Sequence, residues 1–594
     1  MARRTVVATA LAVWFAIGQA ANADTLRTRI EGVRGELRDQ LELVLQSERF
    51  DGETELTPEQ VESRFGAARD GGMQRALEPF GYYQPTVNGR LEREAQRWTA
   101  VFSIALGEPV RVRTLDVRIL ADGEVTAGLG RARDAFPLAP GETFSHILYE
   151  QGKAAIEDAA ARAGFLEGWF VERGVTVDVE ARAADIVLHY SAGRQFHFGE
   201  VTIEPPNLLD PRVLRDFVTI RPGEPFGYGP LLAMQRSLLD TGYFAQVEIE
   251  ALPQLEGPLP PLAVPVRVGL VAARPTRLSL GAGYRTDIGV RGSLDLDLRR
   301  LNALGHQFGI ELQAAEHESF GKAQLVLPRT SRARTDRLVF DLGYADARPD
   351  TSDSKISIGG ASYSRTRGSL VEVASLQFRR DDWNIGPPSA RSAISGRSDF
   401  LLLAVSQTRT ARESPVYSRE GSRLRLRLEA ASEGLLSETD LLRALVDGKW
   451  IQPVGRRFRL LYRTDLAHLW AGEFDVLPPN LRFFTGGDQS VRGFGYNELG
   501  ARNEQGIVIG GDALAVASLE LERRIFDRWA VAAFFDAGDA FFADDPPALR
   551  DLRMGAGLGA RWLSPIGMVR VDVAVAFREP GHPVRFHLTI GPDL

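Results

Sequence analysis

The chain has 594 residues, a formal net charge of −7 at pH 7 and no cysteine. The lack of cysteine excludes disulfides and thiolate metal sites, and the mild negative charge gives no reason to expect nucleic acid, which favours a basic stripe. A chain of this length has room for several domains.

The N-terminus predicts a cleaved signal peptide over residues 1–23. Residues 3–4 are arginines, an apolar run follows at residues 6–17, and residues 21–23 read Ala-Asn-Ala, an A-x-A cleavage site. The apolar run is shorter than the ~20 residues that a membrane-spanning helix needs. We therefore expect an exported protein whose mature chain begins at Asp24, with an uncleaved anchor as the alternative.

A glycine followed by an aromatic residue recurs three times in the next part of the chain. Gly81-Tyr82, Gly164-Phe165 and Gly242-Tyr243 each end a helix-like segment, so the glycines are 83 and 78 residues apart. Such a glycine closes a helix, and the aromatic residue returns the chain to the core before a strand begins. The spacing predicts three α+β domains. Their ranges are 24–107, 108–194 and 195–273.

A second repeated phrase supports this division. Pro-Gly-Glu-x-Phe occurs at residues 140–144 and 222–226, each time just before a helix-like segment. The alternative is three generic α+β domains with no family relationship.

From residue 274 to residue 594 the pattern is that of strands. In residues 422–431 arginines and a glutamate alternate with leucines and an alanine. In a soluble sheet the apolar face would need a second layer, and no helical pattern remains to provide one. In a transmembrane β-barrel the leucines face lipid and the arginines face the watery lumen.

We count sixteen strand candidates, an even number, as bacterial barrels usually have. They are residues 277–285, 289–299, 306–316, 319–328, 336–346, 355–365, 369–380, 398–409, 421–432, 441–451, 456–468, 511–524, 528–537, 553–563, 568–577 and 584–592. The fold class predicted is therefore α+β domains followed by a 16-stranded antiparallel transmembrane β-barrel.

About forty residues separate the eleventh strand candidate from the twelfth. Loops of that length are usually functional or disordered. This one contains Val491, Arg492, Gly493 and Phe494, in a glycine-dense stretch that allows the arginine to enter a narrow space. Inside a lumen the guanidinium would need acidic partners, because a buried unpaired cation is costly.

Strand alternation supplies two candidate partners. Glu520 shares the less apolar face of its strand with Ser518, and a carboxylate at Asp536 would be costly in lipid, so both should point into the lumen. Three glycines, Gly555, Gly557 and Gly559, share a face of the following strand and would leave room for a loop. We therefore predict that Arg492 folds inward and pairs with Asp536 and Glu520. The alternative is an ordinary surface arginine on an extracellular loop.

Together these features resemble the BamA/TamA superfamily of outer-membrane assembly proteins. The resemblance rests on the loop motif with its acidic partners, the three domains, which look like POTRA domains, and the strand run. Within the superfamily the sequences of residues 482–493 and 561–567 are similar to the TamA form. BamA usually has five POTRA domains and commonly ends in an aromatic residue, whereas this chain ends in Leu594.

The resemblance implies a protein of the outer-membrane lipid bilayer with its N-terminal domains in the periplasm. It implies insertion of client β-barrel proteins such as autotransporters, a TamB-like inner-membrane-anchored partner, and a role in phospholipid transport. We expect the first and last strands, 277–285 and 584–592, to pair in a short seam. Gly281 and Gly283 weaken the first, and prolines bound the last. Such a seam can open and offer an edge to a client strand.

Other functions remain as alternatives. A two-partner secretion pore would need a plug helix, for which residues 34–46 are amphipathic, although they suit the first domain equally well. A passive porin would have no use for the N-terminal domains. We expect no catalytic site, cofactor or metal, because the chain lacks H-E-x-x-H, G-x-S-x-G and phosphate-loop motifs. Trp383 and Trp470, beside strand candidates, are predicted interface anchors.

Overall fold

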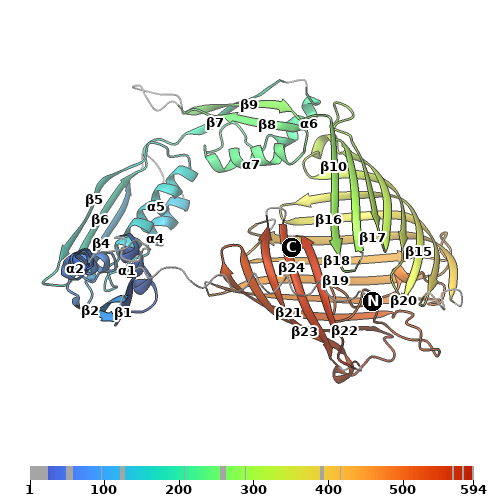
Figure 1. Ribbon diagram of the computed structural model, residues 1–594. Helices are drawn as coiled ribbons and strands as arrows, with labels where there is room; N and C mark the ends of the chain where they lie inside the picture. The colour runs from blue at the N-terminus through green and yellow to red at the C-terminus, as the bar shows by residue number, and fades with distance from the viewer. Residues whose placement is uncertain are drawn as a thin grey trace, which may run out of the picture. The chain divides into compact units, whose positions relative to one another are not determined.

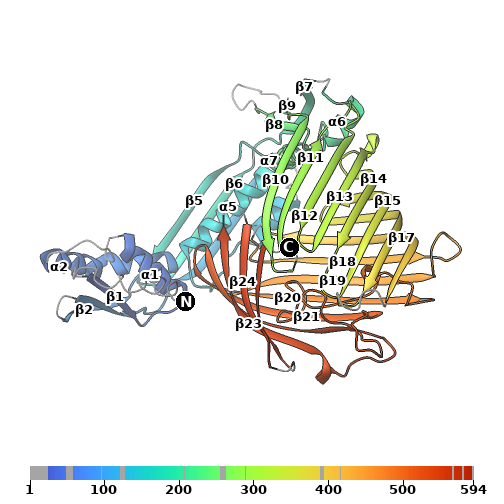
Figure 2. The ribbon, with the colours of Figure 1, turned by 45° about the vertical axis from the view of Figure 1, so that its right-hand side comes forward.

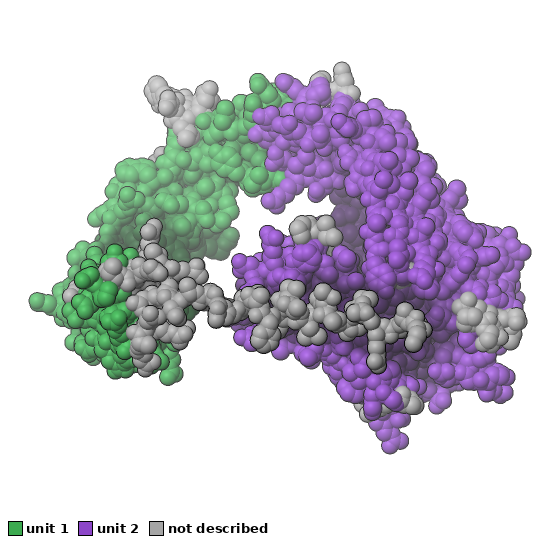
Figure 3. All heavy atoms as spheres, in the orientation of Figure 1, with its two compact units in different colours: residues 1–202, 220–232, 250–267 green, residues 203–219, 233–249, 268–594 purple. Residues whose placement is uncertain are grey.

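The computed structural model describes most of the chain after the N-terminus. The described residues are 25–47, 58–94, 97–120, 127–205, 208–253, 262–287, 289–387, 394–414, 417–455, 457–564, 567–577, 579 and 581–591. The predicted signal peptide, residues 1–23, lies outside them. No helix in this described part is both long and apolar enough to cross a membrane. The chain forms two compact units (Figure 3): residues 1–202, 220–232 and 250–267, and residues 203–219, 233–249 and 268–594.

Three small sheets of the same design precede the barrel. Each is built in the order strand, helices, strand, strand, and in each the last strand lies in the middle of the sheet. The first has β1 (Thr25–Glu31), α1 (Glu36–Ser47), α2 (Pro58–Ala67), α3 (Met73–Leu77), β2 (Thr86–Glu94) and β3 (Arg97–Ala105). The second has β4 (Arg111–Leu120), α4 (Ala127–Asp134), α5 (His146–Arg162), β5 (Trp169–Asp178) and β6 (Ala183–Ser191). The third has β7 (His197–Glu204), α6 (Pro211–Phe217), α7 (Tyr228–Leu239), β8 (Phe244–Glu250) and β9 (Ala263–Ala272).

The two repeated phrases meet where one small domain joins the next. The Val110 amide donates to the Gly81 carbonyl over 2.9 Å, and the Phe144 amide donates to the Val110 carbonyl over 2.9 Å. Gly81 has φ of 88°, the left-handed conformation that favours glycine. The next joint repeats the arrangement, with Phe196 donating to Gly164 over 2.8 Å and Phe226 donating to Phe196 over 2.9 Å. The repeated sequence thus encodes a repeated, hydrogen-bonded joint.

The aromatic residue of the third phrase reaches the barrel. The Tyr243 hydroxyl donates to the Gly305 carbonyl over 2.6 Å, and Gln307 donates to the Thr241 carbonyl over 3.1 Å. Burial raises the pKa of Tyr243 to about 12, so the phenol stays protonated and donating. The segment between α7 and β8 is therefore held to the hairpin between the second and third barrel strands.

The rest of the chain is one antiparallel sheet of sixteen strands in sequence order, β10 to β25 (Figures 1 and 2). The predicted fold class is confirmed. The strands are β10 (Thr276–Arg285), β11 (Gly289–Leu298), β12 (Gln307–Ala315), β13 (Glu318–Pro328), β14 (Asp336–Ala347), β15 (Ser352–Arg367), β16 (Leu370–Ile385), β17 (Ser395–Arg412), β18 (Gly421–Ala431), β19 (Leu441–Val454), β20 (Phe458–Ala471), β21 (Ala513–Phe526), β22 (Trp529–Phe541), β23 (Arg553–Ser564), β24 (Gly567–Phe577) and β25 (Val584–Gly591).

The alternation in β18 has the predicted polarity. Leu424, Leu426 and Leu428 are exposed on the outer face, as lipid contact requires. On the opposite face Arg425 lies 2.6 Å from Asp447 of β19. Several strands are longer than the alternation alone indicated; β17 extends beyond the predicted 398–409 at both ends.

The expected strand pairing at the seam is wrong. Within the described residues β10 and β25 are the two ends of the sheet, and they approach each other without a backbone ladder. The Leu588 amide instead donates to the hydroxyl of Thr286, just past the end of β10, over 3.0 Å. Since Leu588 lies in the middle of β25, antiparallel strands in this stagger overlap over only a few residues.

The prediction for Trp383 is also wrong. Its ring is buried, and its indole nitrogen donates to the Ser398 hydroxyl over 3.0 Å. The indole lies 5.6 Å from the guanidinium of Arg482, inside the barrel rather than at its lipid surface. Trp470 is exposed on the outside, where an interface anchor belongs.

Candidate functional site

The long connection between β20 and β21 is a structured loop with a hydrophobic core of its own. Short bridges join Phe483 to Gly511 and Thr485 to Leu499, so the loop doubles back on itself. Val491, Phe494 and Leu499 are buried together with Val516 of β21 and Ala576 of β24. Because these two strands belong to the barrel wall, the loop lies against the inside of that wall.

Arg492 sits at the tip of this loop and is nearly buried. Its Nε and Nη2 atoms donate to the two carboxylate oxygens of Asp536 over 2.7 and 3.0 Å, a bidentate pair. Its Nη1 atom donates to Glu520 over 2.8 Å. Both partners come from neighbouring wall strands, β22 and β21, where the alternation placed them on the inner face.

Arg492 has further contacts, with Asp572 and Phe534, that were not predicted from the sequence. Nη1 also donates to Asp572 of β24 over 3.1 Å, and the backbone amide of Arg492 donates to Asp536 over 3.1 Å. The guanidinium carbon lies 3.4 Å from the centre of the Phe534 ring, a cation–π contact. Arg492 is thus held by three wall strands and one aromatic face.

A second arginine completes the charge arrangement. Arg561 of β23 donates to Glu520 over 2.7 Å and to Asp572 over 2.6 Å, so it shares both carboxylates with Arg492. It also lies 3.3 Å from Glu522, which in turn accepts from Arg459. Within the described residues the network joins three guanidinium groups to four carboxylates. Such near-balance is what a buried cluster needs, because an unpaired buried charge is strongly destabilising.

The glycines of β23 make room for this arrangement. A side chain at Gly555 would collide with the carbonyl oxygen of Arg492, and one at Gly559 would collide with the carboxylate of Asp572. One at Gly557 would meet the Phe534 ring and the backbone of β24. The loop therefore rests directly on the backbone of the wall.

The base of the loop, near Arg482 and Phe483, is held by contacts of its own. Arg482 is buried and donates to three loop carbonyls, those of Leu477, Asp475 and Ile509, over 2.8, 2.9 and 3.2 Å. Phe483 lies in a second apolar cluster that includes Phe400 of β17. The loop is thus fixed both near its base and at its tip.

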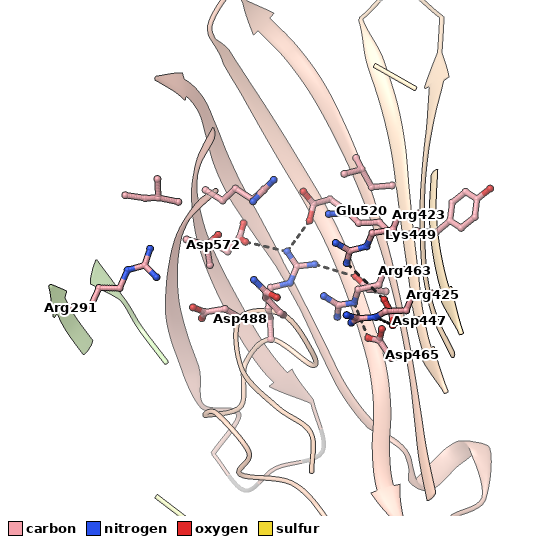
Figure 4. A pocket seen from close by; sticks show the side chains of 18 residues that line it. Arg291, Arg423, Arg425, Asp447, Lys449, Arg463, Asp465, Asp488, Glu520 and Asp572 are labelled. Carbon is pink, nitrogen blue, oxygen red and sulfur yellow. Dashed lines mark hydrogen bonds and ion pairs between the residues drawn. The ribbon is translucent and has the colours of Figure 1, made fainter. Parts of the chain in front are cut away.

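A cavity of about 450 Å³ lies in the lumen beside Arg492 (Figure 4). Its far wall consists of charged side chains from β18, β19 and β20, which Figure 4 labels as Arg423, Arg425, Asp447, Lys449, Arg463 and Asp465. Arg463 reaches across and donates to the Ser490 carbonyl of the loop over 2.7 Å. The lumen is therefore polar and partly filled by the loop.

The missed residues had signals in the sequence. Arg561 shares a face with the three glycines, and Glu522 shares one with Glu520, so alternation already placed both inside. In β24 Asp572 alternates with valines, and the same kind of alternation predicted that Glu520 faces the lumen. The oxygens of Asp536 and Asp572 accept from guanidinium or hydroxyl donors, so these carboxylates serve as anchors for arginine.

Comparisons with known proteins match both the barrel and the first small domain. The Omp85 superfamily domain matches residues 302–593, and the POTRA domain TamA domain 1 matches residues 27–106. The outer membrane protein assembly factor BamA of Nitratidesulfovibrio vulgaris (strain Hildenborough) is 24% identical over 447 residues, covering 69% of this chain and 53% of that protein. The chain thus spans about half the length of that relative.

Two of the solved structures that are similar to this chain are a BamA and a CdiB. The crystal structure of BamA from Haemophilus ducreyi lacking POTRA domains 1–3 has a TM-score of 0.57 at 17% identity, and the match covers 81% of this chain and 99% of that one. CdiB from Acinetobacter baumannii has a TM-score of 0.45 at 13% identity, with 94% and 100% covered. The first of these supports the fold.

A sixteen-stranded barrel, an inward arginine loop and a matching barrel domain define the class: the chain belongs to the Omp85 superfamily. Its first small domain is a POTRA domain of the TamA type, and the two domains that follow share its design. The barrel lies in the bacterial outer membrane, and the POTRA domains lie in the periplasm.

Proposed function

We propose that the protein is an assembly factor that helps β-barrel proteins enter the outer membrane through the seam between β10 and β25. One observation carries the proposal. Among the described strands of the barrel, β10 and β25 are the two that have a ladder on one side only. Their free edges offer backbone donors and acceptors to a client strand, which can pair with them by β-augmentation.

The arginine loop supports this use of the seam. Arg492 ties the loop to β21, β22 and β24, the strands that lead up to β25. Strands braced in this way stay together while the seam opens. Opening is then confined to one place in the wall.

We also propose the finer assignment that the TamA-type POTRA domain suggests. The clients would include autotransporters, the partner would be a TamB-like protein anchored in the inner membrane, and the pair would also serve phospholipid transport. Affinity capture from membranes checks the partner, with recovery of a large inner-membrane-anchored protein as the expected result. Recovery of none would remove this part of the proposal.

The two-partner secretion pore is less well supported. The segment considered as a plug, residues 34–46, overlaps α1, and Leu41 and Leu45 of that helix are buried in the core of the first small domain. A helix with this role is not free to fill a pore. A large, steady conductance in planar bilayers would favour the pore nonetheless.

A disulfide across the seam tests the proposed assembly route. Thr286→Cys with Leu588→Cys introduces two thiols into an otherwise cysteine-free chain, one on each side of the seam, where the Leu588 amide donates to the Thr286 hydroxyl. We expect the oxidised protein to lose assembly of an autotransporter client in lipid vesicles and to regain it on reduction. Each single variant is the control, because it carries one thiol and cannot form the bridge. Equal assembly in the oxidised and reduced states would rule out lateral opening.

A further inference from the structure

The two edge strands of the seam, β10 and β25, are joined by side chains at one end. Thr286, just past β10, lies with its hydroxyl 3.1 and 3.2 Å from the two oxygens of Asp488 on the arginine loop. Asp488 also lies 2.6 Å from Nδ1 of His587 in β25. A loop residue therefore bridges the first strand to the last.

The backbone reinforces these contacts. The Leu588 amide donates to the Thr286 hydroxyl over 3.0 Å, and the Asp488 amide donates to the carboxylate of Asp287 over 3.0 Å. Thr286 thus accepts from β25 while it donates to the loop. Such a chain of hydrogen bonds joins three segments far apart in the sequence.

His587 links this end of the seam to the arginine anchor. Its Nε2 accepts from the amide of Gly493, the residue after Arg492, over 3.0 Å. The ring proton therefore resides on Nδ1 and is donated to Asp488. Both ring nitrogens are in use, and the side chains of His587 and Asp488 are 5% and 0% exposed. Contacts this well buried are protected from competing water.

We infer that Thr286, Asp488 and His587 form a seam latch that holds β10 against β25 in place of a backbone ladder. Asp488 and Arg492 are four residues apart on one loop, so the latch is carried by the same loop that is anchored to the wall. The seam then opens when the latch breaks rather than when a ladder unzips. The consequence for client entry rests on the proposed function, whereas the latch itself does not.

Hydrogen exchange of the full-length protein in lipid nanodiscs tests the latch. Thr286→Val removes the hydroxyl at nearly constant shape, and Thr286→Ser keeps it. We expect Thr286→Val to speed amide exchange in residues 584–591 roughly fivefold, the effect of losing about one hydrogen bond. Asp488→Asn should speed amide exchange in these residues by the same factor or more. Thr286→Ser should exchange at nearly the rate of the unmodified protein.

A matched control separates the latch from general loosening of the loop. The Thr351 hydroxyl donates to the Asn497 carbonyl of the same loop over 3.0 Å, a bond that involves neither terminal strand. Thr351→Val should leave exchange in residues 584–591 unchanged. The latch is overturned if Thr286→Val and Asp488→Asn, with the barrel still folded by heat-modifiable gel mobility, exchange at the unmodified rate. It is also overturned if Thr351→Val has the same effect as Thr286→Val.

Client assembly by these variants gives a separate answer. Faster exchange with altered assembly supports both the latch and the proposed function. Faster exchange with unaltered assembly keeps the latch and contradicts lateral opening as the route for clients.

Discussion

Arg492 owes its importance to the number of partners that one guanidinium can reach. It contacts Asp536, Glu520 and Asp572 from three strands, and the planar fork satisfies Asp536 at both oxygens. A lysine would keep the charge but would offer one compact ammonium in place of the fork. The residue therefore specifies both the position and the orientation of the loop tip.

Replacing Arg492 should destabilise the barrel strongly. Arg492→Ala leaves buried carboxylates short of a cation, so we expect the free energy of unfolding to fall by about 3–5 kcal/mol. We expect Arg492→Lys to have a free energy of unfolding between those of the unmodified protein and Arg492→Ala. Urea unfolding in lipid vesicles, followed by heat-modifiable gel mobility, measures the order of the variants.

The control for this series is Arg348→Ala. Arg348 pairs with Asp346 over 2.5 Å, but its side chain is 59% exposed, and exposed pairs contribute about 0–1 kcal/mol. Similar losses for Arg492→Ala and Arg348→Ala would show that the buried network adds no stability.

At the scale of elements, the loop packs directly on the inner face of β23, where three glycines leave no side chains in the way. Gly555→Ala places a methyl group against the Arg492 carbonyl, so the loop must shift. Overpacking of this kind typically costs about 1–3 kcal/mol. We expect lower stability and faster proteolysis within the loop. Gly292→Ala in β11 is the control, because its nearest neighbouring atom is 4.0 Å away. Identical protease sensitivity of the two variants would contradict the close fit.

Local patterns were enough to predict most of the elements and part of the site. In β21 only one face is apolar, so alternation predicted that Glu520 faces the lumen. In β22 both faces are apolar, so only the cost of a carboxylate in lipid predicted that Asp536 faces the lumen. Asp572 was not predicted, although alternation with valines in residues 571–575 places it on the inner face, because a single carboxylate in a strand does not show which arginine it meets. The seam was mispredicted because the stagger between the first and last strands depends on the whole cylinder, not on either sequence.

At the scale of the molecule, Tyr243 holds the segment between α7 and β8 to the barrel hairpin at Gly305. Tyr243→Phe leaves that carbonyl without the phenol, and we expect a loss of about 1 kcal/mol in docking. Hydrogen exchange in residues 300–307 measures it, with Tyr344→Phe on the exposed outer face of β14 as the control. No difference between the two variants would show that the phenol is not needed for docking.

The same contact predicts a dependence on pH. The folded-state pKa of Tyr243 is about 12, above the ordinary value near 10. The contribution of the phenol is therefore complete below about pH 10 and is lost as the pH rises towards 12. The Tyr243→Phe variant should lack this alkaline loss, whereas the unmodified protein should show it.

The carboxylates that receive Arg492 belong to β21, β22 and β24, all of which follow the loop in the chain. The loop is therefore synthesised before the three strands that carry the acidic partners of Arg492. The full set of acidic partners is present only in a chain that includes β24, and the contact of Gly493 with His587 also requires β25. Full seating of the arginine therefore requires a chain that extends through β24, and a chain truncated before β24 would hold a cation with an incomplete set of counter-charges.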